Sequence, residues 1–495
     1  MAEAPRYRFG QLERRGLLIG LRGSQLVILS AAGVLAVAAL RGLPPGMALG
    51  ACLVIVTTGS IAALVPLSGR CLDEWIPVMS AWSMRTLNGN RSFRSSQPLA
   101  GYTFVAESQP NLPESLSELV LLSHPIPGSA SQLGIVKDRR SGTFTGVLTV
   151  RGRSFALLDA PEKSRRLSSW AGILSGLARE TAPIHRIQWV ERTVPDPGDD
   201  IGGYLKGNIA VALDSPLARS YLEVVDEAGP TTQEHEVFVA LQISAARAGR
   251  AIKAAGGGDL GACEVLRREL TSLSTNLIGT DVMVEGALTP RLLAHALRTG
   301  FDPRCRSGLA SLANADPARR GTSLANAGPM ASEETWSNYR TDDAFHATYW
   351  IAEWPRVDTD PDFLAPLLLR TERMRTVSLT MEPVSPLKAI RSVEAARTSA
   401  AADEELRHRA GFAQTVRRSR EQDSLADHER DLSDGHAFYR FSGFITVTAA
   451  SSMELVSACG EIEEAAGRSF LDVRRLNGEQ ELAFTYTLPL CRGLR

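Results

Sequence analysis

Two long apolar segments lie close together near the start of the chain. No charged residue occurs from Gly23 to Leu40 or from Gly42 to Gly69, and Arg41 alone separates the two segments. A helix of about 20 residues crosses the roughly 30 Å hydrocarbon core of a bilayer. The Pro-Pro-Gly sequence at residues 44–46 is typical of a tight turn. The pattern therefore predicts a transmembrane helical hairpin over residues 23–70.

Arginine is unevenly distributed around this hairpin. Five arginines precede it in residues 1–22 and four follow it between Arg70 and Arg94, whereas the turn carries only Arg41. Because arginine-rich flanks stay cytoplasmic, we expect residues 1–22 to form a cytoplasmic segment and the C-terminus to be cytoplasmic as well. The protein would then cross the inner (plasma) membrane twice, with the lipid bilayer as a partner. A secretory signal peptide and an apolar hairpin buried in a soluble core are the alternatives.

Beyond residue 70 the hydrophobic positions alternate between the periods of strands and of helices. The predicted strands are residues 144–150, 154–159, 184–190, 237–243, 348–353, 376–382, 438–447, 470–476 and 482–488. The predicted helices are residues 161–177, 260–277, 289–297, 360–369 and 452–467. The stretch 386–434 is highly charged and has sparse apolar positions, which indicates one or two long exposed helices.

Composition divides this part of the chain into two lobes. The first lobe is expected at residues 71–302. Residues 303–343 are rich in Gly, Ala, Ser, Asn and Pro and predict a loop or linker. The second lobe is expected at 344–495, with 386–434 as a long charged helical insertion. The predicted fold class is membrane-anchored α+β: the N-terminal two-helix transmembrane hairpin, then mixed α/β cytoplasmic lobes, with helices on one face of the second lobe's sheet.

Charge and cysteine content narrow the function classes. The net charge is −1, so no overall electrostatic attraction favours nucleic acid, and we expect no direct nucleic-acid binding. The six cysteines are scattered and form no CxxC pair. This spacing is typical of free thiols in a reducing compartment rather than of a disulfide framework.

Motifs for nucleotide, nucleophile or metal chemistry are absent or incomplete. No GxxxxGK[ST] loop and no GxSxG elbow occur, and the glycines at 256–258 are followed by Asp259, which indicates a turn. The SxxK match at Ser385 to Lys388 contains a proline and has no KTG partner. His235 and Glu236 lack the second histidine of HExxH.

Two further polar groups have ordinary explanations. Asp199 and Asp200 lie in a Pro- and Gly-rich stretch typical of a turn. Arg417, Arg418 and Arg420 are surrounded by acidic residues, as on a solvated helix surface. We therefore predict no catalytic, cofactor-binding or metal-binding residues.

Two stretches of the chain resemble known families. They are residues 7–22 (YRFGQLERRGLLIGLR) and the C-terminal residues 440–447 (RFSGFITV) with 474–490 (RRLNGEQELAFTYTLPL). The chain resembles a family of actinobacterial two-span membrane proteins that are encoded beside separate ATP-binding proteins. Its hairpin looks like the two-helix membrane subunit of conjugative type IV secretion systems. The remainder looks like the N-terminal, non-catalytic half of their conjugation ATPase, so no functional residue carries over.

The resemblance implies an inner-membrane scaffold subunit of a type IV secretion or conjugation-like apparatus that is not itself an enzyme. It would dock a separate P-loop ATPase and form a homo-oligomer. One alternative is a cytoplasmic-facing membrane core subunit of a type VII secretion system, because those machines also contain a subunit with two N-terminal spans and an α/β cytoplasmic domain. A second alternative is a membrane-bound enzyme with an unrecognised site.

Overall fold

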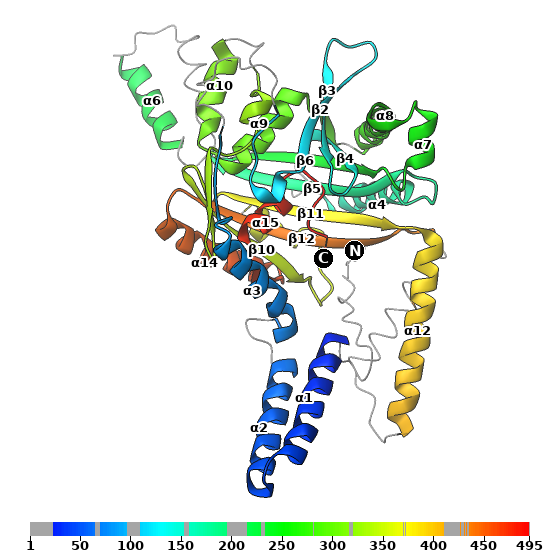
Figure 1. Ribbon diagram of the computed structural model, residues 1–495. Coiled ribbons are helices and arrows are strands. Elements are labelled where there is room, and N and C mark those ends of the chain that lie inside the picture. Colours follow the sequence, from blue (N-terminus) through cyan, green and yellow to red (C-terminus); the bar gives the residue numbers. More distant parts are fainter. Residues whose placement is uncertain are drawn as a thin grey trace. The chain divides into compact units, whose positions relative to one another are not determined.

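A computed structural model describes residues 23–64, 70–96, 109–152, 158–195, 215–228, 233–280, 282–315, 320–369, 371, 373–409, 426, 430, 432 and 435–494. The chain forms two compact units (Figure 1). The smaller unit comprises residues 10–91 and 398–415, and the larger unit comprises residues 1–9, 92–397 and 416–495. The predicted segment 1–22 lies outside the described residues.

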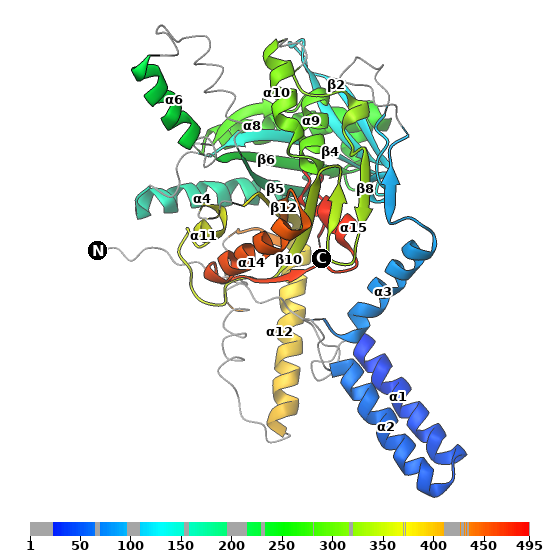
Figure 2. The same cartoon turned by 90° about the vertical axis from the view of Figure 1, so that its left-hand side faces the viewer.

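Three helices form the described N-terminal part of the smaller unit: α1 (Gly23–Gly42), α2 (Pro45–Leu64) and α3 (Leu72–Leu87). Helices α1 and α2 pack side by side as a hairpin (Figure 2), which confirms the two predicted apolar helices. Helix α3 was not predicted from the sequence. It is amphipathic, with Asp73 and Glu74 in its first turn, where acidic side chains favour a helix N-terminus.

One antiparallel sheet, with thirteen strands in the described residues, organises the larger unit. The strands are β1 (Ser92–Arg94), β2 (Leu119–Pro125), β3 (Gln132–Asp138), β4 (Thr143–Arg151), β5 (Ile184–Pro195), β6 (Gln233–Ser244), β7 (Met283–Ala287), β8 (Ala331–Glu334), β9 (Tyr339–Thr341), β10 (Ala344–Glu353), β11 (Arg375–Val384), β12 (Phe438–Ala449) and β13 (Asp472–Arg475). Their order across the sheet is β1-β8-β9-β10-β12-β11-β5-β6-β4-β3-β2. In addition, β7 pairs with β4 and β13 pairs with β10.

Helices and short 3₁₀ turns connect these strands. They are η1 (Glu114–Leu116), α4 (Ala160–Leu177), α6 (Pro216–Ala228), α7 (Gly249–Ala254), α8 (Gly258–Ile278), α9 (Pro290–Phe301), α10 (Cys305–Ala315), η5 (Leu324–Asn326), α11 (Ala365–Leu368), α12 (Pro386–Arg409), α14 (Ser452–Arg468), α15 (Gln480–Phe484) and η6 (Thr485–Thr487). Side-chain caps fix several starts: Asp159, Thr289 and Ser451 each accept a hydrogen bond from a backbone N–H in the first turn.

The strand order contains the same motif twice. In the first copy, the meander β2-β3-β4 is followed by α4, β5, α6 and β6, and β6 inserts between β4 and β5. In the second copy, β8-β9-β10 is followed by α11, β11, α12 and β12, and β12 inserts between β10 and β11. The copies join where β5 and β11 pair antiparallel, with Trp189 opposite Leu379. The sheet is therefore a connectivity repeat arranged around that central pair.

The helices follow the same repeat on both faces of the sheet. On one face α4, α7 and α8 cover the first copy, and α11 and α14 cover the second. Gly146 on β4 lets α8 approach closely, because a Cβ there would lie 2.4 Å from Leu270 Cδ1. On the opposite face α9 follows β7 and α15 follows β13, and the rings of Phe301 and Phe484 lie 5.1 Å apart between centroids. The predicted fold class is confirmed as α+β, although helices cover both faces.

The C-terminal segment ties the two copies together on the α9 face. Gln188, fully buried on β5, accepts from the Cys491 N–H at 2.7 Å and donates to the Tyr486 carbonyl at 2.9 Å. On β11, the hydroxyl of Thr380 donates to the Arg492 carbonyl at 2.8 Å. Strands of both copies thus bind the same short segment.

Most of the predicted elements that lie in the described residues are present, and two of them differ in kind or length. Residues 482–488 were predicted as a strand, which is wrong, because they form the end of α15 and then η6. The buried Gln480 side chain there donates to the Leu476 and Thr348 carbonyls and holds this helical turn against β10, so tertiary contacts override a strand-like pattern. Of the helix predicted at 360–369, only the turn α11 forms. The strand predicted at 154–159 falls largely outside the described residues.

Residues 303–343 also differ from the expected linker. They contain α10, η5, β8 and β9, and the strands before and after them belong to one sheet. The small residues that suggested a linker serve close packing instead: Ala325 and Ala327 are buried, and η5 packs against α9. The charged stretch 386–434 begins with the predicted long helix, α12, and most of its remainder lies outside the described residues.

Candidate functional site

The surface of the α1–α2 hairpin is the first candidate site. In the described part of the chain, two helices are long and apolar enough to cross a membrane: Gly23–Gly42 and Gly46–Leu64. Their large apolar side chains stay exposed, at 69% for Val34 and 72% for Leu49. A core helix of a soluble domain would bury such side chains, and a continuous exposed apolar surface marks an interaction site. Hydrocarbon chains fit this surface.

The two helices contact each other through small residues. A Cβ added at Gly59 would lie 2.5 Å from the Cβ of Ala32, so only glycine permits this approach. Near the open end of the hairpin, the buried Gln25 amide donates to the Ala63 carbonyl at 2.9 Å. Small residues at the contact and an interhelical hydrogen bond are the features that hold helices together in lipid.

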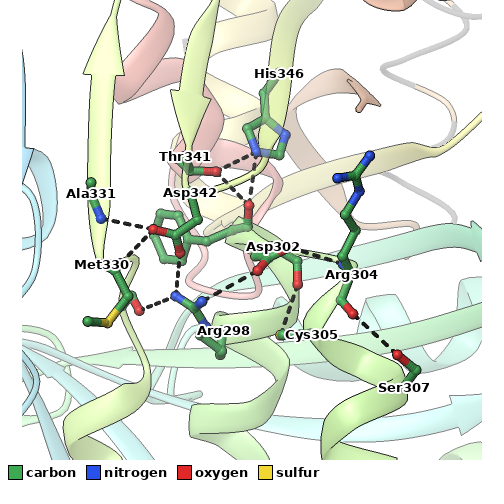
Figure 3. Close-up of polar contacts among 12 residues, drawn as sticks. Arg298, Asp302, Arg304, Cys305, Ser307, Met330, Ala331, Thr341, Asp342 and His346 are labelled. Carbon is green, nitrogen blue, oxygen red and sulfur yellow. Dashed lines mark hydrogen bonds and ion pairs between the residues drawn. The ribbon is translucent and has the colours of Figure 1, made fainter. Parts of the chain in front are cut away.

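A buried polar network in the larger unit is the second candidate site (Figure 3). It joins the end of α9 to the turn between β9 and β10. Arg298 donates to Asp342 Oδ2 at 2.6 Å and to the Gly328 carbonyl at 2.9 Å, and its second terminal nitrogen lies 3.5 Å from Asp302 Oδ2. Both carboxylate side chains are only 11% exposed. The positive charge of Arg298 is therefore balanced by these carboxylates inside the protein.

The backbone of Asp342 explains why the network lies at this turn. Its φ of 47° is in the left-handed region, which aspartate tolerates better than most residues. Its Oδ1 accepts from the backbone N–H groups of Met330 and Ala331, both at 2.9 Å. The same carboxylate therefore fixes the turn and neutralises Arg298.

The protonation states in this network follow from burial and charge. Burial lowers the pKa of Arg298, but the carboxylates of Asp342 and Asp302 outweigh it, so that pKa is raised and the side chain stays charged. Burial raises the pKa of the Cys305 thiol to about 11. The protonated thiol donates to the Asp302 carbonyl oxygen at 2.9 Å.

His346 lies beside this network and is fully buried. Its Nε2 is 3.1 Å from the Phe301 carbonyl oxygen, which can only accept, so Nε2 carries the proton. Its Nδ1 is 3.0 Å from Thr448 Oγ1 and accepts from that hydroxyl. Burial lowers the pKa of His346 to about 4, so the ring is neutral at physiological pH.

This histidine makes the stability of the larger unit dependent on pH. Because its pKa is about 4 when folded and about 6.5 when unfolded, the unfolded chain takes up the proton first as the pH falls. We expect His346 to account for a loss of about 2 kcal/mol in unfolding free energy between pH 7 and pH 5. In urea unfolding at both pH values, the His346→Gln variant should not show this loss of unfolding free energy. The His436→Gln variant, changed at an exposed site, should show the same loss as the parent protein. An unchanged pH dependence in His346→Gln would contradict the assignment.

A second ionic cluster lies where β5 and β6 meet α10. Glu236 is the register partner of Arg192 and lies 3.5 Å from its guanidinium and 2.6 Å from that of Arg306. Burial raises the pKa of Glu236, but Arg192 and Arg306 outweigh it and leave it lowered. Arg192 also donates to Thr299 Oγ1 and the Ala296 carbonyl, so this cluster anchors α9 to the sheet.

These clusters hold elements of the sheet unit together. The described residues contain no group of three His, Cys, Asp or Glu that could hold a metal ion. Burial raises the pKa of Cys263 and of Cys305 to about 11, which disfavours the thiolate, the nucleophilic form of cysteine. Each carboxylate of the two clusters described above is paired with arginine.

The structure accounts for several motifs singled out in the sequence. His235 Nδ1 lies 2.6 Å from Glu191 Oε1 and forms an ion pair or hydrogen bond, not a metal site. The glycines at 256–258 all have positive φ and form the turn before α8. Ser385 precedes α12, and Lys388 lies in its first turn. Asp199, Asp200, Arg417, Arg418 and Arg420 lie outside the described residues.

The Arg298–Asp342 network was not predicted from the sequence. Its members are spread over the end of α9, the stretch taken as a linker and β10, so no spacing rule connects them. The positive φ of Asp342 has only a weak sequence signal, the acidic pair Asp342-Asp343 between two strand-like runs.

Fold and sites together define a protein with a membrane-type helical hairpin and an antiparallel α+β unit held by buried ion pairs. Part of that unit matches a known protein family. Residues 231–351 match the family EccE, described as a type VII ESX secretion system translocon. The match runs from β6 to β10, covers about a quarter of the chain and contains Arg298, Asp342 and His346. No curated protein matches the chain.

This part of the chain is thus similar to a membrane component of a secretion system. The match favours the type VII alternative over the type IV reading, which it does not support.

Proposed function

We propose that this protein is a membrane-anchored, non-enzymatic subunit of a type VII secretion apparatus. The observation that carries the proposal is the EccE match within the sheet unit of a chain that also has two exposed apolar helices. The hairpin anchors the protein in the inner membrane. The sheet unit is cytoplasmic, because arginine is concentrated at both open ends of the hairpin.

The sheet unit supplies the protein–protein contacts. Its partners are other membrane subunits of the apparatus, a separate P-loop ATPase and further copies of this chain. A scaffold role agrees with the clusters described above, in which charged side chains pair with one another inside the fold. It also agrees with the lack of a phosphate-binding loop in the sequence.

Membrane anchoring is tested by charging the middle of each span. Arginine at the centre of a spanning helix costs about 2.5–3.5 kcal/mol for insertion, so the double variant Val34→Arg with Leu53→Arg should lose most of its carbonate-resistant membrane fraction. Leu369→Arg, at an exposed apolar site in the sheet unit, is the matched control and should stay in the membrane fraction. Retention of the double variant would contradict anchoring by this hairpin.

The secretion role is tested by co-purification from the native cell in mild detergent. We expect mass spectrometry to find membrane subunits and the P-loop ATPase of a type VII system, and the purified chain alone to show no ATP hydrolysis. Recovery of type IV subunits instead would restore the other reading. Recovery of neither set, with the hairpin intact, would overturn the proposal.

A further inference from the structure

Helix α3 exposes a surface without charged side chains. Its charged side chains, Asp73, Glu74 and Arg85, are all partly buried. The exposed side chains described along α3 are Ile76, Pro77, Met79, Ser80, Ala81, Ser83, Met84, Thr86 and Leu87, and none is charged. Met84 and Leu87 are 63% and 85% exposed. A helix facing water normally exposes charge there, so this face requires another covering.

Contacts within the smaller unit place the start of α3 at the open end of the hairpin. Ser24 Oγ, at the beginning of α1, lies 2.5 Å from Asp73 Oδ2. The Gln25 amide, one residue further, contacts Cys71 Sγ at 3.6 Å. Since Gly23 and Leu64 are the ends of the two apolar helices, α3 begins at the level where they leave the hydrocarbon. Figure 2 shows α3 turning away from the axis of the hairpin rather than extending it.

Aromatic and basic side chains border the uncharged face. The guanidinium of Arg70 lies 5.3 Å from the centroid of the Trp75 ring, and that of Arg91 lies 4.4 Å from the Trp82 ring. Arg70 is itself buried, whereas Arg91, Trp75 and Trp82 are partly exposed. Tryptophan concentrates at membrane–water interfaces, and a partly exposed arginine can lay its stem along apolar surface while the head reaches phosphate. Arginine–tryptophan pairs next to an exposed apolar face are therefore typical of a helix in the headgroup layer.

We infer that α3 is an interfacial helix whose uncharged face, Ile76 to Leu87, lies in the headgroup and upper acyl region of the bilayer that the hairpin spans. The occupant of this face is phospholipid, because the face starts where the spans end and is bordered by tryptophan and arginine. The inference rests on the proposed membrane anchoring. It adds a second membrane contact, lying in the plane of the bilayer, which would fix the orientation of the hairpin.

Site-directed spin labelling of the full chain in phospholipid vesicles tests this placement. The background carries Cys52→Ala, Cys71→Ser and Cys305→Ser, which remove the three thiols that are not buried. Labels are placed at Met79→Cys on α3, at Val54→Cys on the hairpin and at Glu464→Cys on α14, the last as the exposed aqueous control. We expect the Met79 and Val54 labels to collide several times more with oxygen than with a water-soluble nickel chelate, and the Glu464 label to show the reverse.

The outcomes separate the two proposals. A Met79 label open to the nickel chelate while the Val54 label is protected would overturn the interfacial helix and leave the anchor standing. A Met79 label that is immobile and closed to both reagents would show that protein covers α3, which also overturns the inference. A Val54 label open to the nickel chelate would instead overturn the membrane anchor itself.

Discussion

Replacing Arg298 by alanine should destabilise the sheet unit by about 3–5 kcal/mol, since removing one partner of a buried ion pair leaves the other charge uncompensated. Asp342 and Asp302 would both lose their counter-charge, and both side chains are only 11% exposed. Asp342 would still accept from Met330 and Ala331, so the turn itself should persist. Urea unfolding of the detergent-solubilised protein measures the change.

A double-mutant cycle distinguishes the ion pair from general packing. Adding Asp342→Ala to Arg298→Ala should cost less than the sum of the two single changes, because the second change removes the stranded charge. The matched control is Arg468→Ala on α14, which breaks an ion pair with Glu464 whose side chains are 65% and 66% exposed. We expect that control to stay within about 0.5 kcal/mol of the parent. Additive single changes would show that Arg298 and Asp342 act independently.

Local elements were largely predictable because their signals are local. The starts of α4 and α9 follow from Asp159 and Thr289 before a proline, a cap and first-turn pair that needs no tertiary information. The strands β5, β6, β11 and β12 lie at the centre of the sheet and read as apolar or alternating runs. The apolar hairpin stands out by length alone.

Long-range features were not predictable from one sequence. The pairing of β5 with β11 joins residues about 190 positions apart, and no local pattern states that two expected lobes share a sheet. Composition also misled at residues 303–343, where small side chains permit packing against α9 instead of marking a linker. Arg192 and Arg298 form the buried ion pairs described above, but nothing in the sequence distinguishes them from exposed arginines.

The repeated strand order gives a physical reason for the buried polar residues at its centre. Each copy alone would expose one side of β5 or β11 as an unpaired edge, which is prone to aberrant pairing. Joining the copies removes both edges. The C-terminal segment then crosses the junction, and Gln188 and Thr380 satisfy its backbone groups from the two central strands. The two copies should therefore unfold together rather than as separate lobes.

Phe484→Ala tests this coupling and should cost about 3–5 kcal/mol, the range for deleting a buried phenylalanine ring. The ring lies 5.1 Å from Phe301 in the first copy, and 5.5 Å from Tyr339 and 4.6 Å from His346 in the second, between centroids. The cavity opens between the two copies. The opening free energy measured by amide exchange should therefore fall by the same amount in β6 and in β12. Hydrogen exchange with mass spectrometry measures both strands in one experiment.

The control variant Phe470→Ala, changed at a side chain that is 62% exposed, should leave exchange in both strands unchanged. Faster exchange confined to β12 would mean that the copies are two independent folding units and that the C-terminal segment does not couple them.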